Sequence, residues 1–83
     1  MSNEKLVESL KLAKDSLNEA IEVESIFLVE SAHDILFDLE KNEEFGDDVS
    51  SITSKLKSSY KNNDFYCAEI AYSELGKLIL KIK

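Results

Sequence analysis

The chain has 83 residues, of which 43% are apolar, and it contains a single cysteine. A chain of this size forms one core, and its apolar content is too high for a disordered protein, so we expect residues 1–83 to be a single domain. One cysteine excludes an internal disulfide framework and is typical of a reducing compartment. No basic segment followed by an apolar one opens the sequence, and the longest apolar run, residues 26–29, is far shorter than a membrane span. We therefore expect a cytoplasmic protein with no membrane partner.

The net charge of −7 is concentrated in the middle of the chain. Residues 19–48 contain eleven acidic side chains and one lysine, whereas residues 49–83 contain six lysines and three acids, and the chain has no arginine. Nucleic-acid binding relies on clustered lysine and arginine, so the sequence predicts no nucleic-acid partner. An acidic surface attracts basic proteins instead. A solvated acidic face that only keeps the protein soluble is the alternative interpretation.

A long helical pattern begins the chain, with Ser2 or Asn3 as its expected cap. From Asn3 to Lys41 there is no proline or glycine, and the apolar residues recur at the gaps of three and four that define one buried helix face. The pattern is interrupted at Glu24. We expect the run Ile26–Val29 in the most buried part of the fold, because four consecutive apolar residues cover most of a helix circumference. The apolar residues of the pattern are Leu6, Leu10, Ala13, Leu17, Ile21, Leu28, Ala32, Ile35 and Leu39.

Two architectures satisfy this pattern. In the favoured one the chain turns near residues 22–25, Ser25 caps a second helix, and the protein is a monomeric, all-α antiparallel bundle of four helices. In the alternative, one long helix continues to Lys41 and joins a helical hairpin, giving three helices that must dimerise to cover the first half of the long helix. The scarcity of turn residues favours the long helix, and the matching segment lengths favour the bundle. The four helices of the bundle would cover about 4–22, 26–41, 48–61 and 65–82.

The second half of the chain reads as a loop followed by a helical pair. Asn42 and Gly46 are expected to supply a C-cap and a positive φ, and Asp47 or Asp48 to cap the third helix. Phe45, an apolar residue in an acidic loop, is expected to close the end of the bundle. The residues that the third and fourth helices are expected to bury are Val49, Ile52, Leu56, Tyr60, Ala68, Ala71, Tyr72, Leu75, Leu78, Ile79 and Ile82.

One motif has the spacing of a metal site. Glu30 and His33 form a Glu-x-x-His pair, which places a carboxylate and an imidazole on one helix face, as in di-iron bundles. His33 is the only histidine of the chain, so a site of that kind requires a homodimer. A local ion pair or a histidine at the edge of the core is the simpler interpretation. We therefore expect no metal and no cofactor.

No set of residues predicts catalysis. Cys67 and His33 have no third group to orient them as a nucleophile and its base. Asp34 and Asp38 lie one helical turn apart, but nothing in the sequence desolvates one of them, and acid–base catalysis needs that asymmetry. The sequence therefore predicts a protein that is not an enzyme.

The favoured function is that of a small acidic regulator or inhibitor of a basic protein, of the immunity, antitoxin or antagonist type. Phe65 and Tyr66 are neighbours on the fourth helix and cannot both point inward, and an exposed aromatic residue is a good interface anchor. The other hypotheses are a metal-binding homodimer built on Glu30 and His33 and a structural subunit of a larger helical assembly. The predicted partner-binding residues are Glu30, Asp34, Asp38, Glu43, Glu44, Asp47, Asp48, Phe65 and Tyr66.

Overall fold

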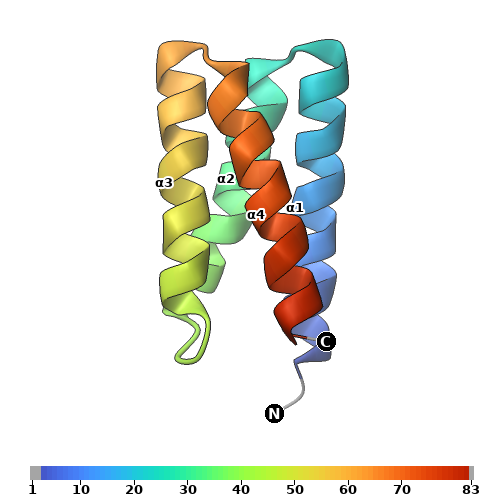
Figure 1. Cartoon of the computed structure of the whole chain (residues 1–83), viewed down its shortest axis with the longest axis vertical. Coiled ribbons are helices and arrows are strands. Elements are labelled where there is room, and N and C mark those ends of the chain that lie inside the picture. Colours follow the sequence, from blue (N-terminus) through green and yellow to red (C-terminus); the bar gives the residue numbers. More distant parts are fainter. Residues whose placement is uncertain (1–2, 83) are drawn as a thin grey trace.

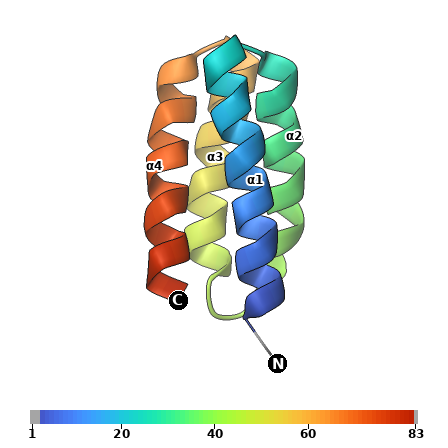
Figure 2. The ribbon, with the colours of Figure 1, turned by 90° about the vertical axis from the view of Figure 1, so that its right-hand side faces the viewer.

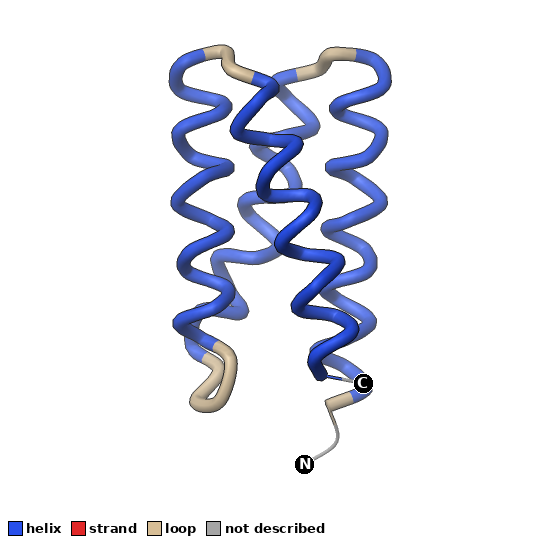
Figure 3. The backbone as a smooth tube through the Cα atoms, viewed as in Figure 1, coloured by secondary structure: helices blue, strands red, loops and turns tan. Residues whose placement is uncertain are grey.

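The computed structural model describes residues 3–82, which form helices joined by short turns (Figure 1; Figure 3). No strand occurs among these residues. Successive α-helices run antiparallel, so the prediction of an all-α antiparallel bundle of four helices is confirmed, and the single long helix of the alternative does not form. The elements are α1 (Glu4–Val23), α2 (Ile26–Phe37), the 3-10 helix η1 (Asp38–Lys41), α3 (Gly46–Asn62) and α4 (Phe65–Ile82).

The turn between α1 and α2 contains neither glycine nor proline. Glu24 adopts the left-handed conformation, with φ 53° and ψ 50°, and the N–H of Ser25 donates to the carbonyl of Ala20 at 2.9 Å. These are the features of a Schellman motif, which satisfies carbonyl groups at the end of a helix. The hydroxyl of Ser25 then accepts the N–H of Leu28 at 3.3 Å, so Ser25 caps α2 as predicted. Glu24, where the apolar pattern breaks, is the residue at which α1 ends.

An apolar core runs along the bundle, and all four α-helices contribute to it. The helices pack in a ring in which α1 contacts α2 and α4, and α3 contacts α2 and α4, so α2 and α4 lie on opposite sides of the bundle (Figure 1; Figure 2). The Cα radius of gyration is 11.6 Å, close to the value of about 12 Å that size scaling gives for a compact chain. The buried apolar side chains are Leu6, Leu10, Ala13, Leu17, Ala20, Val29, Ala32, Leu36, Phe45, Val49, Ile52, Leu56, Ala68, Ala71, Leu75, Leu78 and Ile79.

The run Ile26–Val29 is less buried than predicted. Val29 is fully buried, but Ile26 and Leu28 are half-buried, and Phe27 is 76% exposed. The expectation that this run forms the most buried part of the fold is therefore wrong. The run is the first turn of α2, at the end of the bundle, and no other helix covers its outer side (Figure 2).

The loop between η1 and α3 closes the other end of the bundle (Figure 1). The side-chain oxygen of Asn42 accepts the backbone N–H groups of Glu44 and Phe45, at 3.0 and 2.7 Å. Phe45 is buried against the core, as predicted. Gly46 does not have the expected positive φ. It is needed for space, because a Cβ at Gly46 would lie 2.5 Å from the carbonyl oxygen of Glu40.

The starts of α1 and α3 differ from the prediction in detail. Asn3 is the cap of α1, but its side chain makes no capping hydrogen bond. Ser2, the other predicted cap, lies outside the described residues. Because α3 begins at Gly46, Asp47 and Asp48 lie inside its first turn and do not cap it. Their carboxylates there still interact favourably with the positive end of the helix dipole.

The two helical hairpins, α1–α2 and α3–α4, repeat one pattern at a separation of 39 residues (for example, 59 − 20 = 39). The turn between α3 and α4 uses the same device as the first turn: Asn63 is left-handed, with φ 55° and ψ 44°, and the N–H of Asp64 donates to the carbonyl of Ser59 at 2.9 Å. The outward faces of the two hairpins can therefore be compared position by position. The buried pairs at this separation are Leu6/Phe45, Leu10/Val49, Ala13/Ile52, Leu17/Leu56, Ala20/Ser59, Val29/Ala68, Ala32/Ala71 and Leu36/Leu75.

Candidate interaction surface

The structure separates the predicted partner-binding residues into three groups. The first lies on the outward face of α2 and at the start of η1, the second on the loop before α3 and its first turn, and the third at the start of α4, at the opposite end of the bundle from the loop (Figure 1). These groups do not form one continuous surface. In the same order, their members are Glu30, Asp34 and Asp38; Glu43, Glu44, Asp47 and Asp48; and Phe65 and Tyr66.

The second and third groups contain residues that already have contacts within the protein. The carboxylate of Asp48 lies 3.4 Å from the ammonium of Lys81, an ion pair that joins α3 to α4. Phe65 packs against the core, whereas Tyr66 is 70% exposed. Since the two residues are adjacent on the helix, one faces the core and the other faces solvent. Only Tyr66 is available to a partner.

The outward face of α2 combines carboxylates with exposed aromatic rings. Phe27 is 76% exposed and Phe37 is 57% exposed, although both are large apolar side chains. Glu30, Asp34 and Asp38 are exposed as well, and the spacing of the five residues places them along one side of the helix. We call these five residues the α2 stripe. No lysine occurs within α2, so the helix supplies no cation of its own to neutralise them.

The two phenylalanines bracket most of the stripe. At about 1.5 Å per residue, the ten residues that separate Phe27 from Phe37 span about 15 Å, a length that one helix of a partner can follow. Covering an exposed phenylalanine is worth about 1.5–3 kcal/mol. A partner that covers both rings therefore gains more binding free energy than a solvent-exposed ion pair provides.

The ring of Phe37 stacks on His33 of its own helix, with the ring centroids 5.8 Å apart, and His33 in turn meets the edge of Tyr60 of α3, with the centroids 5.2 Å apart. These three rings line a groove between α2 and α3 together with Glu40, which accepts a hydrogen bond from the Thr53 hydroxyl. A ring that is already ordered loses little entropy when a partner covers it.

The predicted metal pair does not gain further ligands from the fold. Within residues 3–82 there is no group of three or more histidine, cysteine, aspartate or glutamate side chains placed to hold an ion. The side chain of His33 is 13% exposed, and its Nδ1 lies 3.3 Å from Asp34 Oδ1. Glu30 points into solvent one turn before it. His33 thus occupies the edge of the core, between Phe37 and Tyr60.

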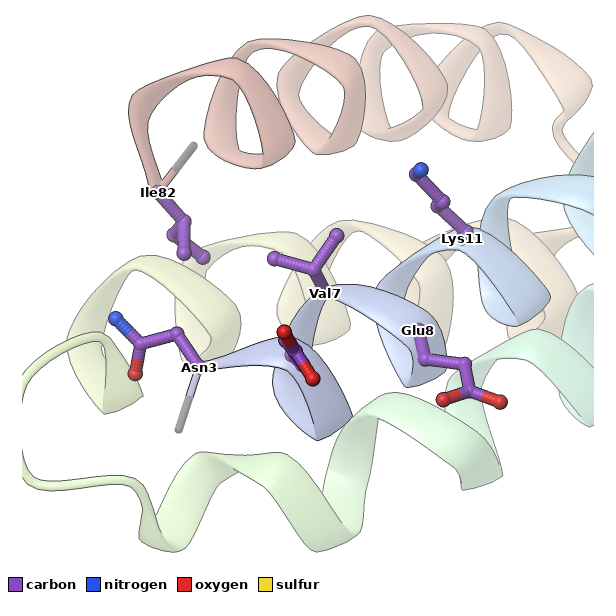
Figure 4. Close-up of a pocket in the computed structure, with 6 residues that line it drawn as sticks. Asn3, Val7, Glu8, Lys11 and Ile82 are labelled. Atoms are coloured by element: carbon purple, nitrogen blue, oxygen red, sulfur yellow. The ribbon is translucent and has the colours of Figure 1, made fainter. Parts of the chain in front are cut away.

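A hollow of about 440 Å³ lies between the start of α1 and the end of α4 (Figure 4). Val7 and Ile82 point toward each other across it, and Glu8 and Lys11 stand at its rim (Figure 4). Its lining combines two apolar side chains with one asparagine, one lysine and two glutamates. Nothing in it singles out a reaction or a ligand.

Neither a protein-family model, nor a curated protein, nor a solved structure matches this chain. None of the helices formed by residues 3–82 combines the length and the apolar character needed to cross a membrane.

The chain contains an internal reference for the α2 stripe, because the two hairpins bury equivalent positions. At the positions of α4 equivalent to Asp34, Phe37 and Asp38 stand a serine, a glycine and a lysine. The equivalent face of α4 thus keeps the carboxylate at the position of Glu30 but has neither the other two carboxylates nor the second ring of the stripe. In full, the stripe residues and their counterparts are Phe27/Tyr66, Glu30/Glu69, Asp34/Ser73, Phe37/Gly76 and Asp38/Lys77.

The prediction of the site from the sequence omitted Phe27 and Phe37. A signal for them exists, because α2 has more apolar residues than one helix face can bury. Once Val29, Ala32 and Leu36 are assigned to the core, the two phenylalanines remain on the other side. Excess apolar residues in an acidic helix therefore point to an interaction surface.

Proposed function

We propose that this protein is a non-enzymatic regulator or inhibitor that binds a basic protein through the α2 stripe. The observation that carries the proposal is the pair of exposed rings, Phe27 and Phe37, flanking carboxylates on a face that the fold leaves free. The equivalent face of α4 keeps one aromatic residue, Tyr66, and replaces Asp38 by Lys77. The face of α2 is thus specialised beyond the needs of the bundle.

The chemistry of the stripe defines the surface that fits it. Lysine or arginine side chains of the partner face Glu30, Asp34 and Asp38, and apolar side chains of the partner cover Phe27 and Phe37. Buried aromatic residues supply most of the affinity of such a contact. The carboxylates mainly raise the association rate and select basic partners, and this contribution weakens as salt is added.

The test is capture of partners by the tagged full-length protein, at low and at moderate salt, with identification by mass spectrometry. We expect the wild-type protein to retain a basic protein, and we expect Phe37→Ala to weaken its binding by about tenfold or more, the effect of losing an interface anchor. Leu12→Ala is the matched control, because Leu12 is an exposed apolar residue of α1, outside the stripe. The activity of the captured protein, measured with and without the bundle, shows whether binding inhibits it.

A charge reversal completes the design. The double variant Asp34→Lys, Asp38→Lys should lose the basic partner at both salt concentrations, while Glu43→Lys, Glu44→Lys makes the same change of charge on the loop and should retain it. An equal loss of the partner in the two double variants, with no loss in Phe37→Ala, would show that the acidic chain attracts basic proteins through its net charge alone. The α2 stripe would then have no specific role.

A further inference from the structure

A second groove lies between α1 and α4, on the side of the bundle away from α2 (Figure 2). It has a volume of about 580 Å³. Lys11, Lys14 and Lys77 line it, and Asp15 is the one acidic residue in the lining. The balance of three lysines against one aspartate makes this groove basic, although the whole chain carries a net charge of −7.

Gly76 lies in this groove, in the middle of α4, and the fold gains nothing from it. Glycine in the interior of a helix is less favourable than alanine by about 1 kcal/mol. A Cβ at Gly76 would meet only the end of the Lys14 side chain, with Nζ at 3.7 Å and Cε at 3.8 Å, which are ordinary contact distances. Gly46, by contrast, has no room for a Cβ. Gly76 therefore leaves a notch in the surface of α4 over which only the flexible end of Lys14 lies, with its Nζ 5.3 Å from the centre of the Tyr72 ring, and a docked side chain would displace that end.

Phe37 and Gly76 occupy equivalent positions of α2 and α4. Each is the twelfth residue of its helix, 11 positions after the start (37 − 26 = 76 − 65 = 11). α2 and α4 begin at the same end of the bundle and run in the same direction on its opposite sides (Figure 1), so residues at the same position along the two helices lie at about the same level. Asp34 and Asp38 flank Phe37 on the stripe, with one lysine, Lys57, in the groove beside the ring, whereas three lysines line the groove around Gly76.

We propose that the α2 stripe of one molecule docks into the α1–α4 groove of a second copy, with Phe37 seated at Gly76. The contact joins two different faces, so one molecule of the pair keeps a free groove and the other keeps a free stripe, and the assembly can grow. This inference rests on the proposed function only in taking the stripe as a docking surface. Self-association covers the stripe and therefore competes with the basic partner.

The charged side chains at the contact attract each other, whereas the net charges of the two molecules repel. Two molecules of net charge −7 repel each other, but at physiological ionic strength the Debye length is about 8 Å, so charges far from the contact are screened. The carboxylates and lysines at the contact lie closer than that. One ring and a few ion pairs make a small interface, so the association is weak and depends on concentration.

Sedimentation velocity of the untagged protein, over about a hundredfold range of concentration, tests the proposal. We expect the average mass of the wild-type protein to rise with concentration. Gly76→Gln fills the notch with a residue of high helix propensity, so it should raise the melting temperature and at the same time abolish the rise in mass. If Gly76 served folding alone, Gly76→Gln would change the melting temperature and leave the rise in mass as it is in the wild-type protein.

A pair of charge reversals tests the contact from both sides. Asp34→Lys, Asp38→Lys leaves a basic stripe and a basic groove, and Lys11→Glu, Lys77→Glu leaves an acidic stripe and an acidic groove. Each variant alone should remain monomeric, and an equimolar mixture should associate, because each stripe then meets a groove of opposite charge. Glu43→Lys, Glu44→Lys is the control, since it also changes the net charge from −7 to −3 and should still associate.

Two results would overturn the proposal: a wild-type mass that stays constant over the whole range, or reversed variants that do not associate when mixed. Capture of a basic protein by Gly76→Gln separates this proposal from the proposed function. Retained capture together with loss of self-association is expected if both hold. Retained capture with no self-association of the wild type would refute only the assembly.

Discussion

At the scale of single residues, Ser59 is a polar side chain in a place that the fold reserves for an apolar one. It is fully buried, and its hydroxyl has no hydrogen-bond partner among the described residues. Its counterpart in the first hairpin is Ala20, which is also fully buried. Ser59→Ala should therefore raise the free energy of unfolding by about 1 kcal/mol, since it removes a buried unsatisfied hydroxyl. Denaturant-induced unfolding measures the change.

The counterpart provides the control for this prediction. Ala20→Ser places a hydroxyl in the equivalent position of α1 and should lower the free energy of unfolding by about 1–2 kcal/mol. A loss of stability in Ser59→Ala would mean that the hydroxyl of Ser59 has a stabilising partner. Ser59 and Ala20 would then not be equivalent in their surroundings, although they occupy the same position in the two hairpins.

At the scale of elements, the turns show how one conformation is made by two different residues. Glu24 and Asn63 are both left-handed, a conformation that asparagine tolerates far better than glutamate. Glu24→Gly should thus stabilise the protein by about 1 kcal/mol, and Asn63→Gly should do so by less. Thermal unfolding of the two variants compares them. An equal gain at both turns would show that the backbone at Glu24 carries no particular strain.

The turn between α1 and α2 explains why the sequence alone did not decide between one long helix and two shorter ones. Without glycine or proline, residues 22–25 offer no turn signal, yet the break of the apolar pattern at Glu24 and the capping serine after it mark the site where the helix ends. The chain turns there because α1 and α2 then cover each other's apolar faces. The free energy of packing α1 against α2 offsets the unfavourable backbone conformation of Glu24. A local sequence pattern does not contain this packing energy.

The buried face of α2 was predictable only in part. The predicted face follows Leu28, Ala32, Ile35 and Leu39, whereas the structure centres it on Val29, Ala32 and Leu36, with the other three half-buried. A helix with apolar residues on most of its circumference does not specify its own orientation. Its neighbours α1 and α3 set it. The acidic residues of the candidate surface follow from charge alone, but the exposure of Phe27 and Phe37 follows from this orientation.

At the scale of the whole molecule, the order of the two hairpins along the chain is not fixed by the core. Asn3 and Ile82 line the same hollow, so a short flexible linker can join the two ends of the described chain (Figure 4). A circular permutant that opens between Glu43 and Glu44 should therefore fold to the same bundle. It should lose about 1–2 kcal/mol of stability, because the cut frees the loop that Asn42 holds through two hydrogen bonds.

Circular dichroism and denaturant-induced unfolding measure the permutant against the parent chain. A wild-type protein with the same linker at its C-terminus is the control for the added residues. A permutant that fails to fold would show that formation of the bundle depends on the first hairpin preceding the second.

The repeat of 39 residues also has a consequence for how this protein can change. The core constrains both hairpins in the same way, but it places no demand on the outward positions, where Phe37 and Gly76 already differ. A substitution on one outward face leaves the other face and the core as they were. The outward faces can thus change without disturbing the core. In the proposed assembly, however, the α2 stripe of one copy meets the α1–α4 groove of the next, so a change in the stripe that suits a new partner also weakens self-association unless the groove changes with it.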